Sequence, residues 1–370
     1  MRIILILTFL MTLNTTKANN RLFKGDKFCK DEDKKCIEYK NLIGSSFYLS
    51  IDDVDTPRKP IHSIYEKMYN EIYPAGILLT LRHSKRIEVI RNFVKNLSKK
   101  QDLPIFIGGD NCQVFYQNKN IRLAPVSNLN SCQSRLRASV AKIAGCNFLL
   151  GPRVEKGILT EDNSNYDEKR VADAKRDIKI YEKVGIFLTI KHFPFTPKRF
   201  DIHHHLIDFQ SPLFKVSKNH FKVFKEFSGG NSPIMTTHVY NTKVDKDIVK
   251  FSKIWNRFIR KDLNFKDNLI VTDSINMFQA YPTNVLNKNF NNFDWQNKMS
   301  APALIFIRSI IAGHNLVINR TASVYQKTLI NDVIQTMKTK YFFSNEFEQN
   351  LINSQKLVKD FKMKFKKQLS

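Results

Sequence analysis

Short runs of consecutive apolar residues alternate along the chain with longer segments in which apolar residues recur every three or four positions. The short runs are rich in β-branched and aromatic residues and nearly free of charge, as strands of a parallel sheet covered on both faces are. We expect strands at 47–51, 76–81, 104–108, 147–150, 186–190, 233–237, 269–272 and 315–318. The longer segments predict helices near 61–72, 85–99, 132–144, 168–183, 217–227, 247–262, 300–311 and 323–338, and a final amphipathic helix over 345–366.

A strand followed by a helix, repeated eight times, predicts an α/β fold in which the strands close on themselves. The expected architecture is a single-domain (β/α)8 barrel of the TIM type with a C-terminal helix. We expect the barrel domain to span 41–370 and a charged, irregular N-terminal extension to span 19–40. No linker or second domain is indicated.

The first eighteen residues have the pattern of a secretory signal peptide. Met1 and Arg2 give a positive start, an apolar run covers 3–13, and Thr16-Lys-Ala18 is a small-x-small cleavage site. The apolar run is too short to span a bilayer as a mature helix, and a retained anchor is the alternative. We therefore expect an exported protein, periplasmic or secreted from a bacterium, with no transmembrane segment in the mature chain.

The five cysteines are compatible with export. Cys29 and Cys36 flank a charged loop and could close a small disulfide in an oxidising compartment. An odd number leaves at least one thiol free or paired with another chain. The spacing is not a zinc pattern.

The formal net charge of +26 is large, and it is spread along the chain rather than held in one tail. Such a charge suggests nucleic acid first, but no nucleic-acid-binding motif supports that interpretation. Attraction to anionic cell-envelope polymers or membrane surfaces fits equally well. A lysine-rich coding bias with no partner behind it is the third interpretation.

Polar residues of catalytic type follow several of the expected strands. In a barrel of this kind the chemistry lies at the carboxyl ends of the strands. The residues just past the strands are Asp110, Lys191 with His192, His238 and Asp273. A polar residue capping one strand end is ordinary, but this combination exceeds what a solvated edge needs.

Four short motifs carry a resemblance to a known family. They are Lys191-His-Phe-Pro194, Asp201-Ile-His203, Met235-Thr-Thr-His-Val239 and Thr272-Asp-Ser-Ile-Asn-Met277. In order and spacing they resemble motifs of glycoside hydrolase family 3, in its bacterial β-N-acetylhexosaminidase branch. The resemblance covers nearly the whole mature chain.

The resemblance implies an exported retaining glycosidase acting on N-acetylglucosamine-containing glycans, such as peptidoglycan fragments. It makes Asp273 the nucleophile and His203 the acid/base, with Asp201 orienting His203. Imidazole suits that role because it titrates near neutrality and can both give and take a proton. The substrate-binding residues would be Asp110, Lys191, His192 and His238. No cofactor and no metal are implied.

The chain also departs from the family pattern. The strand-three motif is shortened to Asp110-Asn-Cys-Gln-Val114, and Phe195-Thr-Pro197 replaces the glycines after the first motif. The acidic segment 160–163 stands where the family has a substrate-binding arginine after strand four. These changes suggest a shifted substrate, or a catalytically inactive glycan-binding or envelope protein on the same barrel. A metal hydrolase is a weaker alternative, because the spacing of His203, His204 and His205 fits no compact zinc motif.

Overall fold

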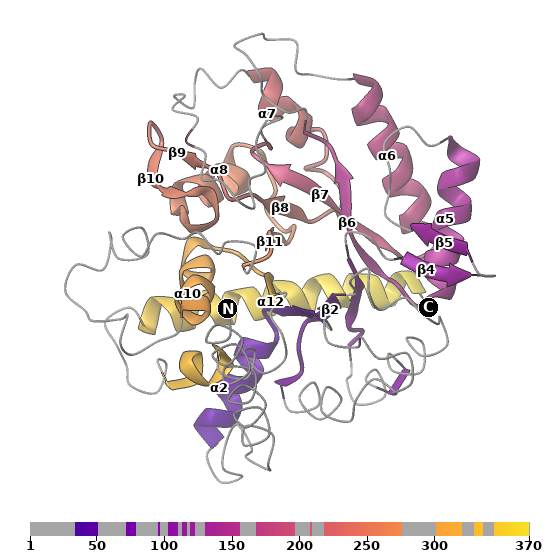
Figure 1. The fold of residues 1–370 in the computed structure, drawn as a ribbon. Helices are drawn as coiled ribbons and strands as arrows, with labels where there is room; N and C mark the ends of the chain where they lie inside the picture. Colours follow the sequence, from indigo (N-terminus) through magenta and orange to yellow (C-terminus); the bar gives the residue numbers. More distant parts are fainter. Residues whose placement is uncertain are drawn as a thin grey trace, which may run out of the picture.

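The computed structural model describes residues 34–50, 72–78, 95–96, 103–109, 113–116, 119–122, 130–155, 168–196, 208, 218–275, 301–319, 329–335 and 344–369. Two four-stranded parallel sheets form its centre (Figure 1). The first has the order β12 (Val317–Asn319), β1 (Phe47–Ser50), β2 (Gly76–Leu78) and β3 (Phe106–Gly108). The second has the order β11 (Ile270–Thr272), β8 (Ile234–Thr236), β7 (Phe187–Phe193) and β6 (Phe148–Arg153). The α/β class and the parallel strands are as the sequence predicts.

Main-chain hydrogen bonds connect the two sheets at both pairs of edge strands. Next to β3, the N–H of Asn147 donates to Ile107 O at 2.8 Å. Between β11 and β12, the N–H of Thr272 donates to Leu316 O at 3.0 Å. Each sheet edge therefore finds acceptors and donors on the other sheet rather than in solvent.

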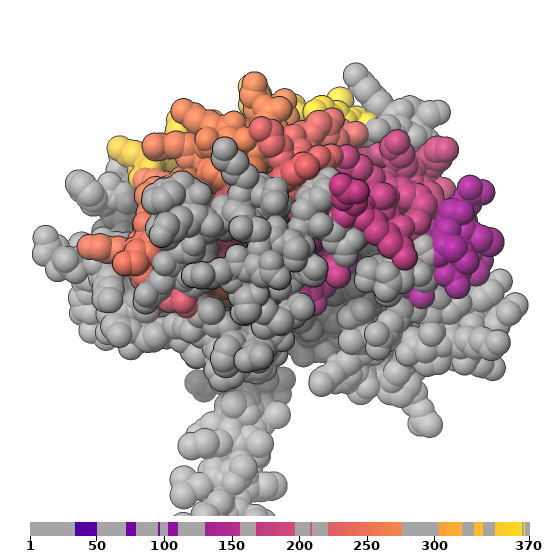
Figure 2. All heavy atoms as spheres, turned by 90° about the horizontal axis from the view of Figure 1, so that it is seen from above, coloured from indigo at the N-terminus to yellow at the C-terminus, as the bar shows by residue number. Residues whose placement is uncertain are grey.

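The helices follow the strands as the periodicity predicts. They are α5 (Ser131–Ile143), α6 (Glu168–Glu182), α7 (Lys218–Lys225), α8 (Lys253–Lys261), α10 (Ala301–Ala312) and α12 (Ser344–Leu369). A capping box fixes the start of α5, because Asn130 and Gln133 each bond the other's backbone N–H. The helices α5 and α6 lie side by side (purple and magenta in Figure 2), joined by a 2.8 Å bond from Ser134 Oγ to Asp177 Oδ1.

The helix α12 completes an apolar cluster formed by strand residues. This cluster joins side chains of the parallel strands to two residues of the helix: Tyr48, Leu78, Phe106, Phe148, Leu150, Phe187, Met235, Val271, Ile318, Val358 and Phe361. The ring centroid of Phe361 lies 4.7 Å from Phe187 and 5.9 Å from Phe106. These two are the first residues of β7 and β3, so Phe361 packs at the amino ends of the strands.

Two local expectations are wrong, and one hairpin was not foreseen. The helix α2 (Lys34–Gly44) crosses the predicted boundary at residue 40, so residues 34–40 are helical rather than irregular. The helix expected over 247–262 is divided: β9 (Tyr240–Asn241) pairs with β10 (Asp245–Ile248), a 3-10 turn η2 (Val249–Phe251) follows, and α8 then begins. Ser252 caps α8 by accepting from Trp255 N, and this fixes the start of the helix. A hairpin of β4 (Gln113–Tyr116) and β5 (Lys119–Arg122) was also not foreseen.

Cys36 and Cys146 each take part in a disulfide, and Cys132 is a free, exposed thiol. Cys29 lies outside the described residues, so its pairing with Cys36 stays a prediction. The segment 1–18 also lies outside them. Within the parts of the chain that are described, no helix is long and apolar enough to cross a membrane.

Candidate active site

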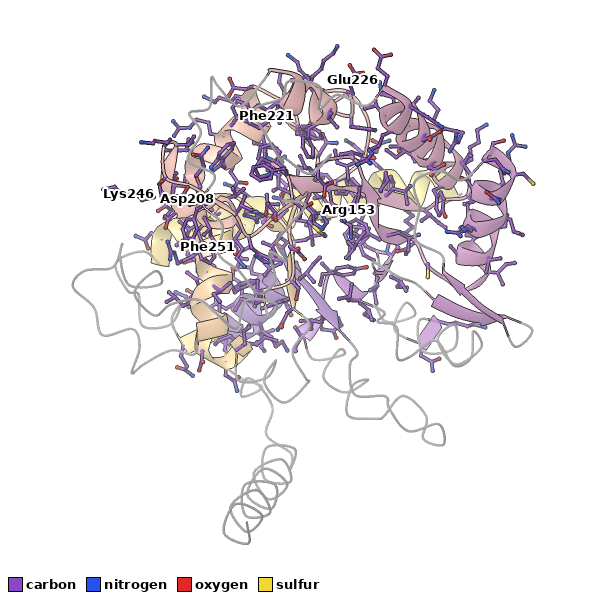
Figure 3. All side chains as sticks on the ribbon, turned by 45° about the horizontal axis from the view of Figure 1, so that its top comes forward. Arg153, Asp208, Phe221, Glu226, Lys246 and Phe251 are labelled. Carbon is purple, nitrogen blue, oxygen red and sulfur yellow. The ribbon has the colours of Figure 1, made fainter. Side chains whose placement is uncertain are left out.

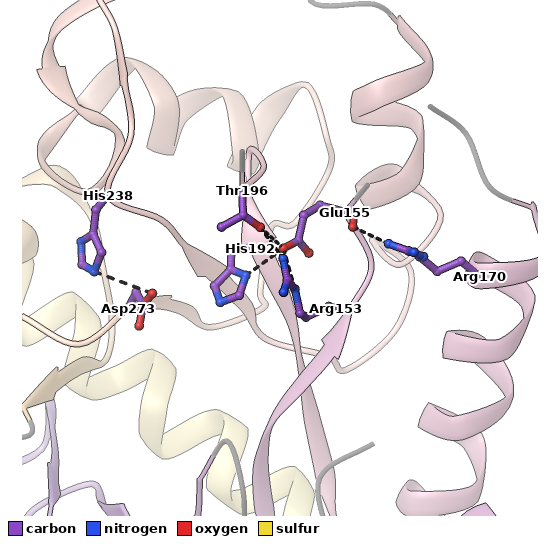
Figure 4. Close-up of polar contacts among 7 residues, drawn as sticks. All are labelled: Arg153, Glu155, Arg170, His192, Thr196, His238 and Asp273. Carbon is purple, nitrogen blue, oxygen red and sulfur yellow. Dashed lines mark hydrogen bonds and ion pairs between the residues drawn. The ribbon is translucent and has the colours of Figure 1, made fainter. Parts of the chain in front are cut away.

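Four neighbouring parallel strands of the second sheet carry polar side chains at or just after their carboxyl ends (Figure 4). Glu155 comes just after β6, Lys191 and His192 lie near the end of β7, His238 follows β8, and Asp273 follows β11 directly. Because the strands are parallel, these carboxyl ends meet at the same edge. Each of the five residues is at least nine-tenths buried.

Asp273 is held in a fixed orientation. Its Oδ1 accepts a 2.7 Å bond from Ser274 N, and its own N–H donates to Thr236 O at 3.0 Å. The Nε2 atom of His238 lies 3.7 Å from Asp273 Oδ2, and His238 is fully buried. The carboxylate is therefore anchored through one oxygen and faces a histidine with the other.

A second cluster is centred on Glu155, which sequence reasoning missed. Its Oε1 lies 2.9 Å from His192 Nδ1 and 3.2 Å from Arg153 Nε, and it accepts a short bond from the Thr196 hydroxyl. Because an ionised carboxylate can only accept, the hydrogen of a neutral His192 ring sits on Nδ1. This leaves Nε2, on the other side of the ring, to bind or exchange protons.

Glu155 keeps its charge despite its burial. Burial acts to raise the pKa of Glu155, but His192 first, and then Arg153 and Thr196, hold that pKa below its ordinary value. The main chain is fixed as well, because Arg170 of α6 donates to Glu155 O at 2.7 Å. The carboxylate is therefore a permanent acceptor that orients His192.

Two further buried bases lie near Asp273. Burial lowers the pKa of His314 to about 3, so its ring is neutral at neutral pH. Its Nδ1 donates to Ser309 O at 3.1 Å, which leaves Nε2 to accept from Thr236 Oγ1 at 2.8 Å. Burial also lowers the pKa of Lys250 to about 7, against the opposing attraction of Asp273.

The structure corrects the expected placement of Lys191 and His192. We expected both just past a strand that ends at residue 190, but β7 continues to Phe193. The extension is possible because the register with β8 shifts, so that Phe193 pairs with Thr236. The peptide bonds Lys191–His192 and Phe193–Pro194 are both cis.

Three predicted site residues, Asp110, Asp201 and His203, lie outside the described residues. The structure brings Lys191, His192, His238 and Asp273 to one edge, and the roles of all seven residues remain predictions. Among the residues that are described, no group of three or more His, Cys, Asp or Glu side chains could hold a metal ion.

Glu155 and Arg153 were missed because the strand before them was expected to end too early. The strand was expected to end at Leu150, just before the Gly151-Pro152 pair. The strand β6 instead continues to Arg153, with a register shift against β7 between Leu150 and Arg153. A longer strand would have placed Glu155, rather than the acidic segment at 160–163, at the strand-four exit.

No protein-family model and no curated protein matches the sequence. Solved structures do match. The glycoside hydrolase family 3 β-N-acetylglucosaminidase of Paenibacillus sp. strain FPU-7 has a TM-score of 0.67 at 15% identity, over 88% of this chain and 62% of that one. The β-N-acetylglucosaminidase of Thermotoga maritima has a TM-score of 0.63 at 19% identity, over 86% and 67% of the two chains. The β-N-acetylhexosaminidase of Beutenbergia cavernae has a TM-score of 0.64 at 14% identity, over 88% and 98%.

These similarities establish the fold of the chain. It has an α/β fold built on parallel sheets. More particularly, this is the fold of β-N-acetylglucosaminidases of glycoside hydrolase family 3, at an identity that marks a divergent sequence. The chain spans less than two thirds of the length of the Paenibacillus enzyme.

Proposed function

We propose that this protein is a divergent glycoside hydrolase of family 3, a retaining β-N-acetylglucosaminidase or hexosaminidase. The observation that carries the proposal is the placement of Asp273. The fold is shared with β-N-acetylglucosaminidases. In it the oriented, almost fully buried Asp273 follows a strand directly and lies beside His238, two strands from Lys191 and His192.

The architecture we propose is one closed (β/α)8 barrel, supported by the hydrogen bonds that connect the two sheets at both edges.

In the proposed reaction Asp273 attacks the anomeric carbon of the sugar. The bond from that carbon to the leaving oxygen breaks as a proton reaches the oxygen, and a glycosyl-enzyme ester forms. Water then attacks the same carbon, its proton returns to the acid/base residue, and the carboxylate is released. We assign the acid/base role to His203, oriented by Asp201.

The remaining residues bind and orient the sugar. Lys191, His192 and His238 stand at neighbouring strand exits, and we assign them, with Asp110, to the sugar hydroxyls or the acetamido group. The Glu155–His192 bond of 2.9 Å supports this assignment for His192, because it fixes the tautomer that offers Nε2 to a ligand. The substrates we propose are N-acetylglucosamine-containing glycans such as peptidoglycan fragments.

We further propose that the protein is exported to the periplasm or beyond. The bonded state of Cys36 and Cys146 supports this, since disulfides persist in oxidising compartments. The net charge of +26 suits association with anionic envelope polymers. Binding to such a polymer should then weaken steeply between low and physiological salt, which co-sedimentation would measure.

The decisive experiment measures release of p-nitrophenol from the β-N-acetylglucosaminide by the wild type, Asp273→Asn and His203→Ala. We expect turnover to fall by roughly a thousandfold or more in Asp273→Asn, because the covalent route is lost, and by a smaller factor in His203→Ala. Equal activity in wild type and Asp273→Asn would overturn the assignment. Saturable binding of chitooligosaccharide by a folded wild type without hydrolysis would favour the glycan-binding alternative.

A further inference from the structure

We propose that Lys250 is the buried counter-cation of Asp273, a positioning residue whose ammonium group acts on the carboxylate from the protein interior. The inference rests on the proposed function for its catalytic meaning, but its physical content is independent of turnover. Lys250 is fully buried, its Nζ atom included. It was not among the residues that the sequence singled out.

The backbone brings Lys250 to the site. The hairpin of β9 and β10 leaves the site at Val239 and returns as η2, where Val249 N donates to Val239 O at 3.0 Å. This bond brings Lys250, which follows Val249, close in space to His238, which precedes Val239. The Nε2 atom of His238 in turn lies 3.7 Å from Asp273 Oδ2, and the attraction of Asp273 acts on Lys250 to raise its pKa.

Two of the described carboxylates beside η2 have partners of their own. From α10, Arg308 binds Asp247 of β10 at 2.6 Å. Its guanidinium also lies 4.4 Å from the ring centroid of Phe251, the residue of η2 that Figure 3 labels. Asp245 of β10 accepts from Ser252 Oγ, beside α8. Behind the site, His314 is neutral at neutral pH, and the positive charge of Lys250 helps to keep it so.

A buried carboxylate is stable as an anion only if nearby charges or donors compensate for lost hydration. Ser274 N supplies one donor to Asp273, and Lys250 supplies a charge that water cannot screen. In the proposed reaction this charge acts most in the second step. The ester of Asp273 is neutral, and its cleavage restores a carboxylate, so a buried cation favours the leaving carboxylate and speeds deglycosylation.

The test measures the ionisation of Asp273 directly, by carboxyl carbon NMR of protein labelled at aspartate. The resonance is assigned as the one missing in Asp273→Asn. The variants are Lys250→Met and Lys250→Gln, which remove the charge, and Lys250→Arg, which keeps it. The matched control is Lys362→Met, because Lys362 is also almost fully buried and burial lowers its pKa to about 7 as well.

We expect the Asp273 resonance to titrate higher by about one pH unit or more in both neutral variants. It should stay near its wild-type position in Lys250→Arg and in Lys362→Met. Where turnover is measurable, the neutral variants should also accumulate several-fold more glycosyl-enzyme, seen by intact-mass analysis. Two neutral substitutions keep the test informative if one of them misfolds.

Titration of Asp273 at the same pH in wild type and both neutral variants would overturn the role of Lys250. A shift of similar size in Lys362→Met would also overturn it, because the effect would then be general. If the wild type hydrolyses nothing but the shift is present, the proposed function fails while Lys250 remains the counter-cation.

Discussion

A buried lysine lies at each end of the parallel strands, and the two lysines have different surroundings. At the carboxyl ends Lys250 lies among groups that carry or transfer charge, and Asp273 opposes the loss of its proton. At the amino ends the Nζ atom of Lys362 lies 4.9 Å from the ring centroid of Phe106, and burial alone lowers its pKa to about 7. The comparison teaches that burial by itself does not mark a functional cation. The neighbours decide whether the charge can act or only destabilises the fold.

The largest effect on stability should come from removing a buried ring at the amino ends of the strands. Phe361→Ala removes a ring that packs on Phe187 and Phe106, and we expect it to lower the free energy of unfolding by about 3–5 kcal/mol. Urea denaturation would measure the change. Met363→Ala on the same helix is the control, because Met363 is 41% exposed. Equal effects of the two substitutions would show that α12 does not close the core through Phe361.

Next in size is the loss of a buried charge at the carboxyl end. Glu155→Ala leaves His192 and Arg153 without their acceptor, and we expect a loss of about 3 kcal/mol in stability together with reduced turnover. Glu226→Ala is the control, since its 2.6 Å pair with Lys175 is partly exposed and contributes at most about 1 kcal/mol. Full activity in Glu155→Ala would contradict the orienting role given to that carboxylate.

The smallest effect is the contribution of Lys362 to the pH dependence of stability. Below about pH 7 Lys362 is protonated in both the folded and the unfolded state, so it gives stability no pH dependence there. Between about pH 7 and its unfolded value the unfolded chain binds the extra proton, so stability rises with pH. We expect Lys362→Met to remove about 2 kcal/mol of that rise between about pH 7 and 9, measured by denaturation at both values. An unchanged rise in the variant would mean that Lys362 reaches water.

The sequence predicted the strands better than their ends. Each expected strand overlaps an observed one, because a buried parallel strand must be almost continuously apolar. The ends of β6 and β7 were placed too early, at the last residues of the apolar runs, whereas shifts of register let both strands continue. This displacement of a few residues hid Glu155, one of the best-connected side chains of the site.

Lys250 was beyond sequence reasoning for a different reason. Its surroundings in the sequence predict an exposed face of an amphipathic helix, where a lysine is ordinary. The hairpin of β9 and β10 turns this segment inward, and only the tertiary bond between Val249 N and Val239 O places it beside His238. Asp273 and His238, by contrast, follow apolar strands directly, so the sequence alone brought them together.

The pairing of β1 with β12 has a consequence for the order in which the chain can fold. Phe47 of β1 pairs with Val317 of β12, and Ser46 Oγ, next to Phe47, lies 3.2 Å from Ser354 Oγ of α12 across 308 positions of sequence. Such long-range contacts slow folding, because the intervening loop must close before they stabilise anything. A nascent chain that has not yet synthesised α12 still exposes the rings of Phe106 and Phe187 that Phe361 will cover. Until α12 has been made and packs in place, this exposed apolar surface makes the partly folded chain prone to aggregation.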